Sequence, residues 1–423
     1  MKTVFGLDFG TSNSALSILT NDRVEVIGLE PFNEGQKTMR SILFFDESGN
    51  VYFGQEAINK YLENNAHGRL MQSIKTFLPS TVLGATYVYG KKYELEDIIA
   101  LVLSQIKLTG ECYVGHEVDS VVMGRPVVFS DDQQADKLAE ARLRRAANLA
   151  GFKHVAFQME PIAAAFAFES GLNIREEKLV LVGDFGGGTS DFTVIRLSGS
   201  RKRQQDRSQD VLSTSGIYLA GDAFDSALMW RKVAQYFGRD VQHRNMSGNW
   251  LSMPLSVMSK LKAWHLIPQL REKSVREFIR KVRTFADDQQ SIRNLEHLIE
   301  DNYGFFLFQA IERAKIDLST TDKTEILFSE RDLHIAESVH RLEFEQIVQD
   351  LLRRIGDKID LAVAQAGVHR EDIDLVLTTG GTSYIPCVRD LFAVRFGQEK
   401  IQQIDAYTSV AHGLGLSASM ILS

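Results

Sequence analysis

Two segments of the chain share one pattern, in which an apolar run leads into a glycine turn and a second apolar run follows. Residues 4–18 show this pattern once and residues 179–197 show it again, each with Asp-Phe-Gly at the turn. Apolar runs that flank a glycine turn predict a strand, a tight turn and a second strand. The repeat indicates two lobes of similar build, each presenting one hairpin.

Helical and strand-like patterns alternate along the rest of the chain, which is typical of α/β architecture. No Pro-, Gly- or Ser-rich linker divides the sequence, so we expect the two lobes to pack closely. The apolar spacing predicts helices over 95–106, 132–150, 160–167, 222–235, 305–318, 343–366 and 409–421, and strands over 118–128 and 374–377.

Composition narrows the class of protein. Of 423 residues, 44% are hydrophobic and 24% are charged, which fits a globular chain with a full core. The net charge of −7 argues against nucleic-acid binding, because phosphate neutralisation needs a basic surface. Two cysteines, Cys112 and Cys387, exclude a disulfide scaffold and fit a reducing compartment. Without a signal peptide or a membrane span, we expect a cytoplasmic protein that makes no membrane contact.

The candidate functional segments are three glycine turns that follow apolar strands, at residues 8–13, 184–191 and 380–383. Glycine lets the backbone approach a phosphate closely, and successive N–H groups can bind an anion. Nearby threonine and serine hydroxyls can donate to phosphate oxygens. Asp8 and Asp184 offer hard oxygen for Mg²⁺, held through water. One glycine turn is usually only a turn, but two matched hairpins and a third turn favour phosphate binding.

These turns belong to a series of segments that resembles the nucleotide-binding domain of the heat shock protein 70 family, the DnaK-type chaperones of the actin-like ATPase superfamily. The resemblance follows the chain in order from residue 3 to its last helix, and it suggests the short bacterial homologues that consist of the ATPase portion without a peptide-binding domain. The segments that carry it are 6–14, 160–167, 184–191, 221–225, 312–319, 380–386 and 410–415.

The resemblance implies an α/β fold of two actin-like, ribonuclease H-like lobes around a nucleotide cleft. Lobe I would comprise residues 1–175, completed by 402–423. Lobe II would comprise residues 176–401, with an enlarged small subdomain that includes 240–300.

The resemblance also implies a role for each matching residue. Lys75 would steady the attacking water, and Glu160 would position that water or a magnesium-bound one. Asp184 and Thr189 would complete the catalytic set. The cofactors would be ATP or ADP and Mg²⁺, with K⁺ near the metal shell. The metal would be held by Asp8, Asp184 and Asp191. The phosphates would be held by Gly10, Thr11, Ser12, Asn13, Gly186, Gly187, Gly188 and Thr189. Glu312, Lys315 and Ser319 would contact the adenosine ribose or base. The nucleotide would also be bound by Gly221, Asp222, Ile316, Gly380, Gly381, Thr382 and Tyr384.

Four positions depart from the family, and two of them would lie beside the base; the other two are Ala220, in place of a glycine, and Asn148, in place of an arginine. The family flanks adenine with two arginines, and here Ile316 and Tyr384 stand in their places. Tyr384 can stack on a base and Ile316 can give it an apolar floor, but the cation–π contribution is lost. We therefore expect weak discrimination between adenine and guanine.

The function we favour is a slow Mg²⁺-dependent ATPase whose nucleotide states act on a partner, either a protein client or a co-chaperone. A small-molecule kinase of the same superfold, a nucleotide-dependent actin-like filament protein and a binding module without useful turnover remain open.

Two other segments have competing interpretations. Residues 413–418 match a dinucleotide fingerprint, but no βαβ unit can follow, so close helix packing explains their glycines better. Residues 240–300 interleave aromatic and basic side chains. They could pack onto lobe II, form a protein docking surface or contact nucleic acid, and the acidic charge of the whole chain disfavours the last.

Overall fold

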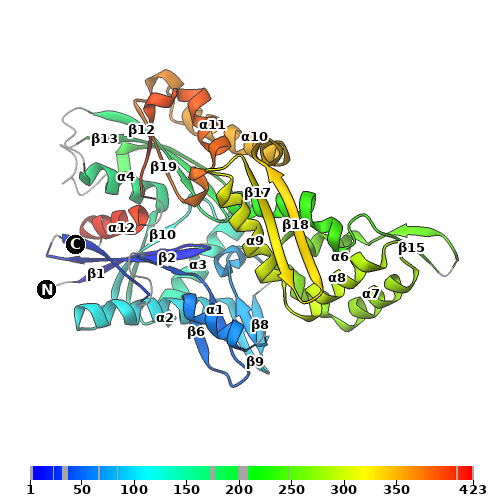
Figure 1. Cartoon of the computed structure of the whole chain (residues 1–423). Helices are drawn as coiled ribbons and strands as arrows, with labels where there is room; N and C mark the ends of the chain where they lie inside the picture. Colours follow the sequence, from blue (N-terminus) through cyan, green and yellow to red (C-terminus); the bar gives the residue numbers. More distant parts are fainter. Residues whose placement is uncertain are drawn as a thin grey trace. The chain divides into compact units, whose positions relative to one another are not determined.

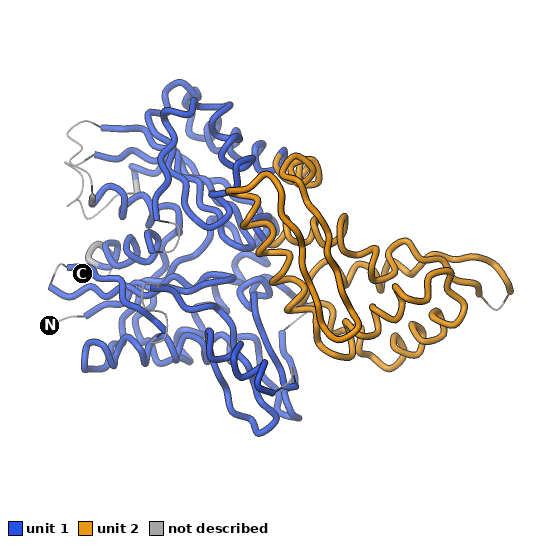
Figure 2. The backbone as a smooth tube through the Cα atoms, in the orientation of Figure 1, with its two compact units in different colours: residues 1–221, 353–423 blue, residues 222–352 orange. Residues whose placement is uncertain are grey.

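The chain folds into α/β layers in the computed structural model (Figure 1), which confirms the predicted fold class. It divides into two compact units, unit 1 with residues 1–221 and 353–423 and unit 2 with residues 222–352 (Figure 2). These bounds differ from those of the expected lobes, whose assignment stays a prediction. The structure describes residues 3–21, 23–30, 37–64, 67–82, 84–171, 177–198, 208–245, 247–405 and 408–421.

The first sheet of unit 1 has the strand order β11-β10-β1-β2-β3, with β4 pairing on β2. Strand β1 is antiparallel to β2 and parallel to β10, and β10 is parallel to β11. Its strands are β1 (Val4–Phe9), β2 (Asn13–Thr20), β3 (Arg23–Ile27), β4 (Thr38–Arg40), β10 (Ser120–Arg125) and β11 (His154–Met159).

The second sheet of unit 1 repeats this plan, with the order β20-β19-β12-β13-β14. Strand β12 is antiparallel to β13 and parallel to β19, as β1 is to β2 and β10. The internal repeat predicted from the sequence is therefore a repeat of sheet topology. Its strands are β12 (Lys178–Phe185), β13 (Ser190–Leu197), β14 (Val211–Ile217), β19 (Leu375–Thr379) and β20 (Ile401–Gln403).

Helices recur at corresponding places in the two halves. The first half has α2 (Leu95–Val114), α3 (Gln133–Leu149) and α4 (Glu160–Gly171), and the second has α10 (Arg341–Gln365), α11 (Pro386–Phe396) and α12 (Ser409–Ile421). The helices expected here are confirmed with shifted ends. Helix α2 continues past the predicted end at 106, because its stop is Gly115, which takes the left-handed conformation at φ 77°.

Helices α4 and α12 pack against each other and share one apolar cluster with strands of both sheets (Figure 1). A Cβ on Gly413 would lie 1.7 Å from the carbonyl oxygen of Ala163, so the two helices touch through their backbones. Gly415 likewise faces the Ser17 hydroxyl, 2.7 Å from where its Cβ would be. Close packing, as the sequence predicted, is the reason for these glycines.

The rest of unit 1 consists of small elements beside the first sheet. A three-stranded sheet joins β5 (Leu43–Phe45), β6 (Val51–Phe53) and β7 (Arg69–Met71), and helix α1 (Gly54–Glu63) follows β6. A hairpin joins β8 (Ala85–Val88) to β9 (Lys91–Glu94). Between β7 and β8 lies one 3₁₀ turn, Ile74–Phe77, which carries Lys75.

Unit 2 begins with a helix that is interrupted where the sequence predicted a continuous one over 222–235. Helix α5 (Gly221–Leu228) passes into a π-turn, Met229–Val233, and then a 3₁₀ turn, Ala234–Phe237. The guanidinium of Arg239 donates to the carbonyl oxygens of Trp230 and Arg231, which partly replaces the backbone bonds that the wider turn displaces.

The remainder of unit 2 joins two hairpins with helices. A T-shaped pair of rings, Phe224 and Phe344, lies in its core with centroids 6.1 Å apart. No helix among the described residues of the whole chain is long and apolar enough to cross a membrane. The elements are β15 (Gln242–Arg244), β16 (Trp250–Ser252), α6 (Leu255–Met258), α7 (Lys273–Phe285), α8 (Gln289–Glu300), α9 (Gly304–Asp317), β17 (Lys323–Glu330) and β18 (Leu333–His340).

Candidate nucleotide-binding site

The first predicted phosphate turn is the tip of the β1–β2 hairpin in unit 1. Gly10, Thr11 and Ser12 form the tip, and Asn13 begins β2. A Cβ on Gly10 would lie 2.2 Å from the carbonyl oxygen of Asn13, so only glycine fits this turn. The tip residues keep partial exposure, which leaves them accessible to a ligand.

The second predicted turn is the tip of the β12–β13 hairpin, formed by Gly186, Gly187, Gly188 and Thr189. The Gly186 N–H donates to the Thr189 carbonyl oxygen at 3.0 Å and closes the turn. A Cβ on Gly188 would lie 3.4 Å from Thr11 Oγ1, so the two hairpin tips meet. Two turns that are far apart in sequence therefore form one glycine- and hydroxyl-rich surface.

Lys75 and Glu160 form a buried ion pair in the same unit. The Lys75 ammonium donates to Glu160 Oε1 at 2.6 Å, and both residues are less than 10% exposed. Glu160 is the first residue of α4, where the helix dipole favours a carboxylate. Its side chain packs on Gly124 of β10, where a Cβ would lie 3.1 Å from Glu160 Cγ. The pair fixes the position of an ammonium in a carboxylate-rich region.

The two predicted metal residues of the second hairpin face each other, since Asp184 of β12 stands opposite Asp191 of β13. Like charges in such a cross-strand pair repel each other. Asp8 of β1, in contrast, stands opposite Ala15. The second hairpin therefore brings two carboxylates to the site and the first brings one.

Burial and mutual repulsion alter the pKa values of these groups. Burial raises the pKa of Asp8 to about 7, with repulsion from Glu160 adding to it and Lys75 opposing it. Burial and then Glu160 raise the pKa of Asp191 to about 7. Burial, followed by Glu160 and Asp191, holds the pKa of Asp184 well above its ordinary value. Burial lowers the pKa of Lys75, but Glu160 and Asp8 outweigh it and the net shift is upward.

These residues fit a hydrated Mg²⁺. Four carboxylates surround one ammonium, so the cluster has an excess of negative charge. The Asp191 Oδ1 atom accepts from the Val127 N–H at 2.8 Å, whereas its Oδ2 is buried without a partner in the described part of the chain. In the described segments no three His, Cys, Asp or Glu side chains could hold an ion directly. Mg²⁺ keeps much of its water shell, and carboxylates can hold it through that water.

The third predicted turn lies against the second hairpin. Gly380 has φ +83°, and a Cβ there would lie 2.0 Å from the Phe185 carbonyl oxygen. The Thr382 hydroxyl donates to the Gly186 carbonyl oxygen at 3.3 Å. Gly381 is exposed, and the Tyr384 ring is 45% exposed. Unit 1 thus unites all three glycine turns.

Unit 2 carries half of the nucleotide-binding residues that were predicted outside the two hairpins. Glu312, Lys315 and Ile316 lie on α9, Ser319 follows it, and Asp222 lies in the first turn of α5, next to Gly221. Ile316 is 58% exposed, as a residue that meets a ligand would be.

Lys315 is buried in an ion pair, and its contact with the nucleoside stays a prediction. Its ammonium donates to Asp225 Oδ2 at 2.7 Å. Burial raises the pKa of Asp225 to about 6 although Lys315 lowers it, and burial followed by repulsion from Asp225 raises that of Asp222 to about 7. The structure thus adds Asp225 to the set predicted from sequence.

Sequence reasoning also missed two groups in unit 1. The Thr76 methyl lies 3.6 Å from the Cβ position of Gly188, beside the hairpin tips. The backbone N–H of Val127 binds Asp191. Thr76 follows Lys75 directly, which was the available signal, whereas no sequence pattern marks a single backbone N–H.

Comparison with known proteins identifies the family. A sequence model of the family described as Hsp70 protein matches residues 4–251 and 283–423. The chain is also 29% identical over 430 residues to "Chaperone protein DnaK" of Thermosipho melanesiensis. That alignment covers 99% of this chain and 59% of the relative, so the chain spans little more than half of that protein's length. The repeated α/β sheets are those of the actin-like ATPase fold, and the chain belongs to the Hsp70 family.

Proposed function

We propose that this protein binds Mg·ATP and hydrolyses it slowly, and that its two nucleotide states present different surfaces to a partner protein. The observation that carries the proposal is the Lys75–Glu160 pair, buried among Asp8, Asp184 and Asp191 in the unit that holds the glycine turns. Membership in a family of chaperone ATPases supports it.

The backbone and hydroxyl groups of the hairpin tips would bind the β- and γ-phosphates, since Thr11, Thr189 and the turn N–H groups are the donors there. Asp8, Asp184 and Asp191 would hold Mg²⁺ through water. When bound, the ion would neutralise phosphate charge and orient the chain of phosphates.

Lys75 would orient the attacking water and neutralise charge on the γ-phosphate. Glu160 would restrict the ammonium to one position, because their contact is 2.6 Å and both are buried. In phosphoryl transfer to water, such positioning and charge neutralisation supply most of the catalysis.

The test is to measure ATP binding by calorimetry and phosphate release under single-turnover conditions, with Mg²⁺, for the parent and for Lys75→Ala. We expect Lys75→Ala to bind ATP within about threefold of the parent and to hydrolyse it at least about 100-fold more slowly, the loss typical of one preorganised electrostatic group. Lys323→Ala, an exposed lysine at the start of β17, is the matched control. Parent-like hydrolysis by Lys75→Ala would show that the catalytic assignment is wrong.

Asp184→Asn tests the proposed metal role separately. The variant should require a higher Mg²⁺ concentration for half-maximal turnover, because it removes one carboxylate from the cluster. Sedimentation of the parent with and without ATP would reveal a nucleotide-dependent filament. A search for phosphorylated small molecules would reveal a kinase activity.

A further inference from the structure

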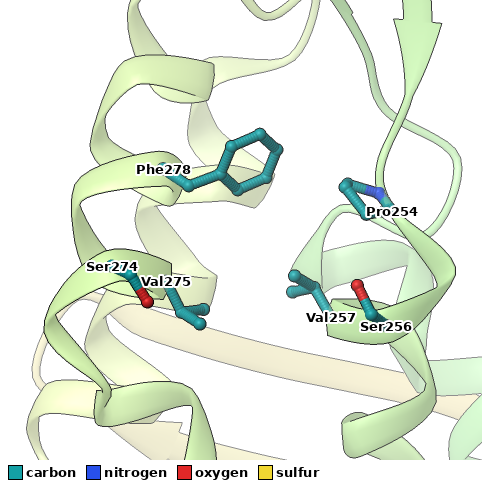
Figure 3. Close-up of a pocket in the computed structure, with 6 residues that line it drawn as sticks. All are labelled: Pro254, Ser256, Val257, Ser274, Val275 and Phe278. Carbon is teal, nitrogen blue, oxygen red and sulfur yellow. The ribbon is translucent and has the colours of Figure 1, made fainter.

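Residues 252–282 lie between the two stretches that match the Hsp70 family. In the structure they contain a shallow open groove of about 270 Å³, between the start of α6 and helix α7 of unit 2 (Figure 3). Both walls of the groove belong to the stretch that the family model does not match. It is lined by Pro254, Ser256, Val257, Ser274, Val275 and Phe278.

The groove is apolar at its floor. Val257 and Val275 point toward each other from opposite walls (Figure 3). Phe278 stands one turn beyond Val275 on α7, and its ring meets the His243 ring edge-on, with centroids 5.9 Å apart. Val275 and Phe278 remain only half-buried, whereas Ile279 on the neighbouring face of α7 is 1% exposed. Helix α7 therefore has a packed face and, beside it, an apolar face that is open to solvent.

The groove lies in a strongly basic part of an acidic protein. Residues 252–282 contain seven lysines and arginines against two glutamates, while the whole chain has a net charge of −7. Arg280 and Arg283 of α7 are paired with Glu300 and Glu296 of α8. The excess positive charge must therefore be carried by other side chains.

Besides Arg280, which is paired with Glu300, three cations of α7 are exposed: Lys273, Arg276 and Lys281. None of them has a carboxylate partner among the described residues. Lys281 follows Phe278 by three positions and Ser274 by seven, so on a helix it lies on the same side as the groove. An apolar slot with an unpaired cation at its edge is complementary to an acidic amphipathic segment.

We propose that this groove binds an acidic, amphipathic segment of a partner protein. One bulky apolar side chain of that segment enters between Val257, Val275 and Phe278, and a carboxylate of the segment pairs with Lys281. A helix in a hydrophobic groove is a recurring mode of such recognition. Nucleic acid fits less well, because the floor is aliphatic and the rest of the protein is acidic. The proposal does not depend on ATP hydrolysis.

The test uses fluorescence anisotropy with the full chain and two labelled model helices. Both probes carry Leu and Phe at i, i+3, i+4 and i+7, with Glu at the other positions in one and Lys in the second. Ser274→Trp should block the groove without removing a core residue, because Ser274 is exposed. Lys281→Glu reverses the charge at its edge, and Lys323→Glu makes the same change on β17 as a control.

We expect the acidic helix to bind the parent in a salt-sensitive manner, and the basic helix to bind at least about tenfold more weakly, a difference of about 1.4 kcal/mol. Ser274→Trp and Lys281→Glu should each weaken the acidic helix about tenfold, with Lys323→Glu unchanged. Absence of binding, or binding that survives Ser274→Trp, would overturn the proposal. So would tighter binding of a labelled dT oligonucleotide at these residues, or self-association of the chain that Ser274→Trp abolishes.

Discussion

Among the described residues, each unit of the protein contains a buried lysine that is paired with a buried carboxylate. Lys75 and Glu160 in unit 1 are 2.6 Å apart, Lys315 and Asp225 in unit 2 are 2.7 Å apart, and both lysines are 7% exposed. In both cases burial lowers the pKa of the lysine, and the surrounding carboxylates raise it by more. Geometry and burial therefore do not distinguish the two pairs.

The surroundings do distinguish them. Near Lys75 the further carboxylates stand at strand ends beside glycine turns, where phosphate and a metal can be held. Near Lys315 they lie on α5 and α9, and the described residues of these two helices form no glycine turn of the kind found at the two hairpins. A buried ion pair fixes the position of two charges but does not by itself determine what those charges do. We propose that the neighbouring groups give the Lys75–Glu160 pair a role in ATP hydrolysis and the Lys315–Asp225 pair a role in positioning α9.

The largest expected difference between the pairs concerns turnover. Glu160→Ala should lower the rate of ATP hydrolysis about 100-fold, because Lys75 loses the contact that fixes its position. ATP affinity should change much less. Single-turnover phosphate release and calorimetric binding would be measured on the same preparations, and Asp225→Ala, which breaks the other pair, is the control. Equal losses of hydrolysis rate in the two variants would show that the two ion pairs do not differ in their effect on turnover.

A smaller effect is expected on nucleotide affinity. Lys315→Ala should raise the dissociation constant for ATP about tenfold, the cost of one charge-assisted hydrogen bond, by releasing the region of α9 that carries Glu312 and Ile316. At saturating ATP its rate should stay near that of the parent. Lys323→Ala on β17 provides the matched control. A variant that binds ATP normally but does not turn it over would contradict this separation of roles.

The carboxylates of unit 2 should also give the protein a pH-dependent stability. The pKa of Asp222 is raised to about 7 by burial, so its contribution to stability is full below about pH 4 and is lost as the pH rises through 7. Asp222→Asn should therefore stabilise the nucleotide-free protein by about 1–2 kcal/mol at pH 8, after allowing for its partial exposure, and by little near pH 4. Urea unfolding at several pH values measures this. A gain that does not depend on pH would contradict the assignment.

The smallest effect concerns the base. Since Ile316 and Tyr384 supply no guanidinium plane, we expect the parent to prefer ATP over GTP by less than about tenfold. Tyr384→Arg should raise ATP affinity about two- to fivefold, the usual range for an exposed cation–π contact. Val394→Arg, at an 86% exposed position of α11, controls for the added charge. A large ATP preference in the parent would show that another residue reads the base.

Much of the fold could be predicted from the sequence because its signals are local. The two Asp-Phe-Gly hairpins and most of the helices follow from apolar spacing and glycine stops. The break in the helix that was predicted over 222–235 could not be seen in these local signals. It involves hydrogen bonds from the Arg239 guanidinium to the carbonyl oxygens of Trp230 and Arg231. Such a contact is decided by tertiary packing.

The candidate site was predictable only in part, for the same reason. The glycine turns are visible in the sequence, but Lys75 stood out only through its resemblance to a family. Its partner Glu160 lies 85 positions away, and the Lys315–Asp225 pair spans 90 positions. No periodic pattern encodes such distant pairs, so the buried partner of each lysine emerged only from the structure.

The packing of α12 on the first sheet has a consequence for the synthesis of the chain. The Ser17 hydroxyl on β2 donates to the Ala411 carbonyl oxygen, 394 positions later. During translation, β1 and β2 therefore lack the helix that covers them until residues 409–421 have left the ribosome. Contacts between such distant segments form slowly, and the uncovered apolar face is prone to aggregate meanwhile. A chain stopped at residue 405 should bind an apolar dye strongly, and weak dye binding would show that the strands fold without this helix.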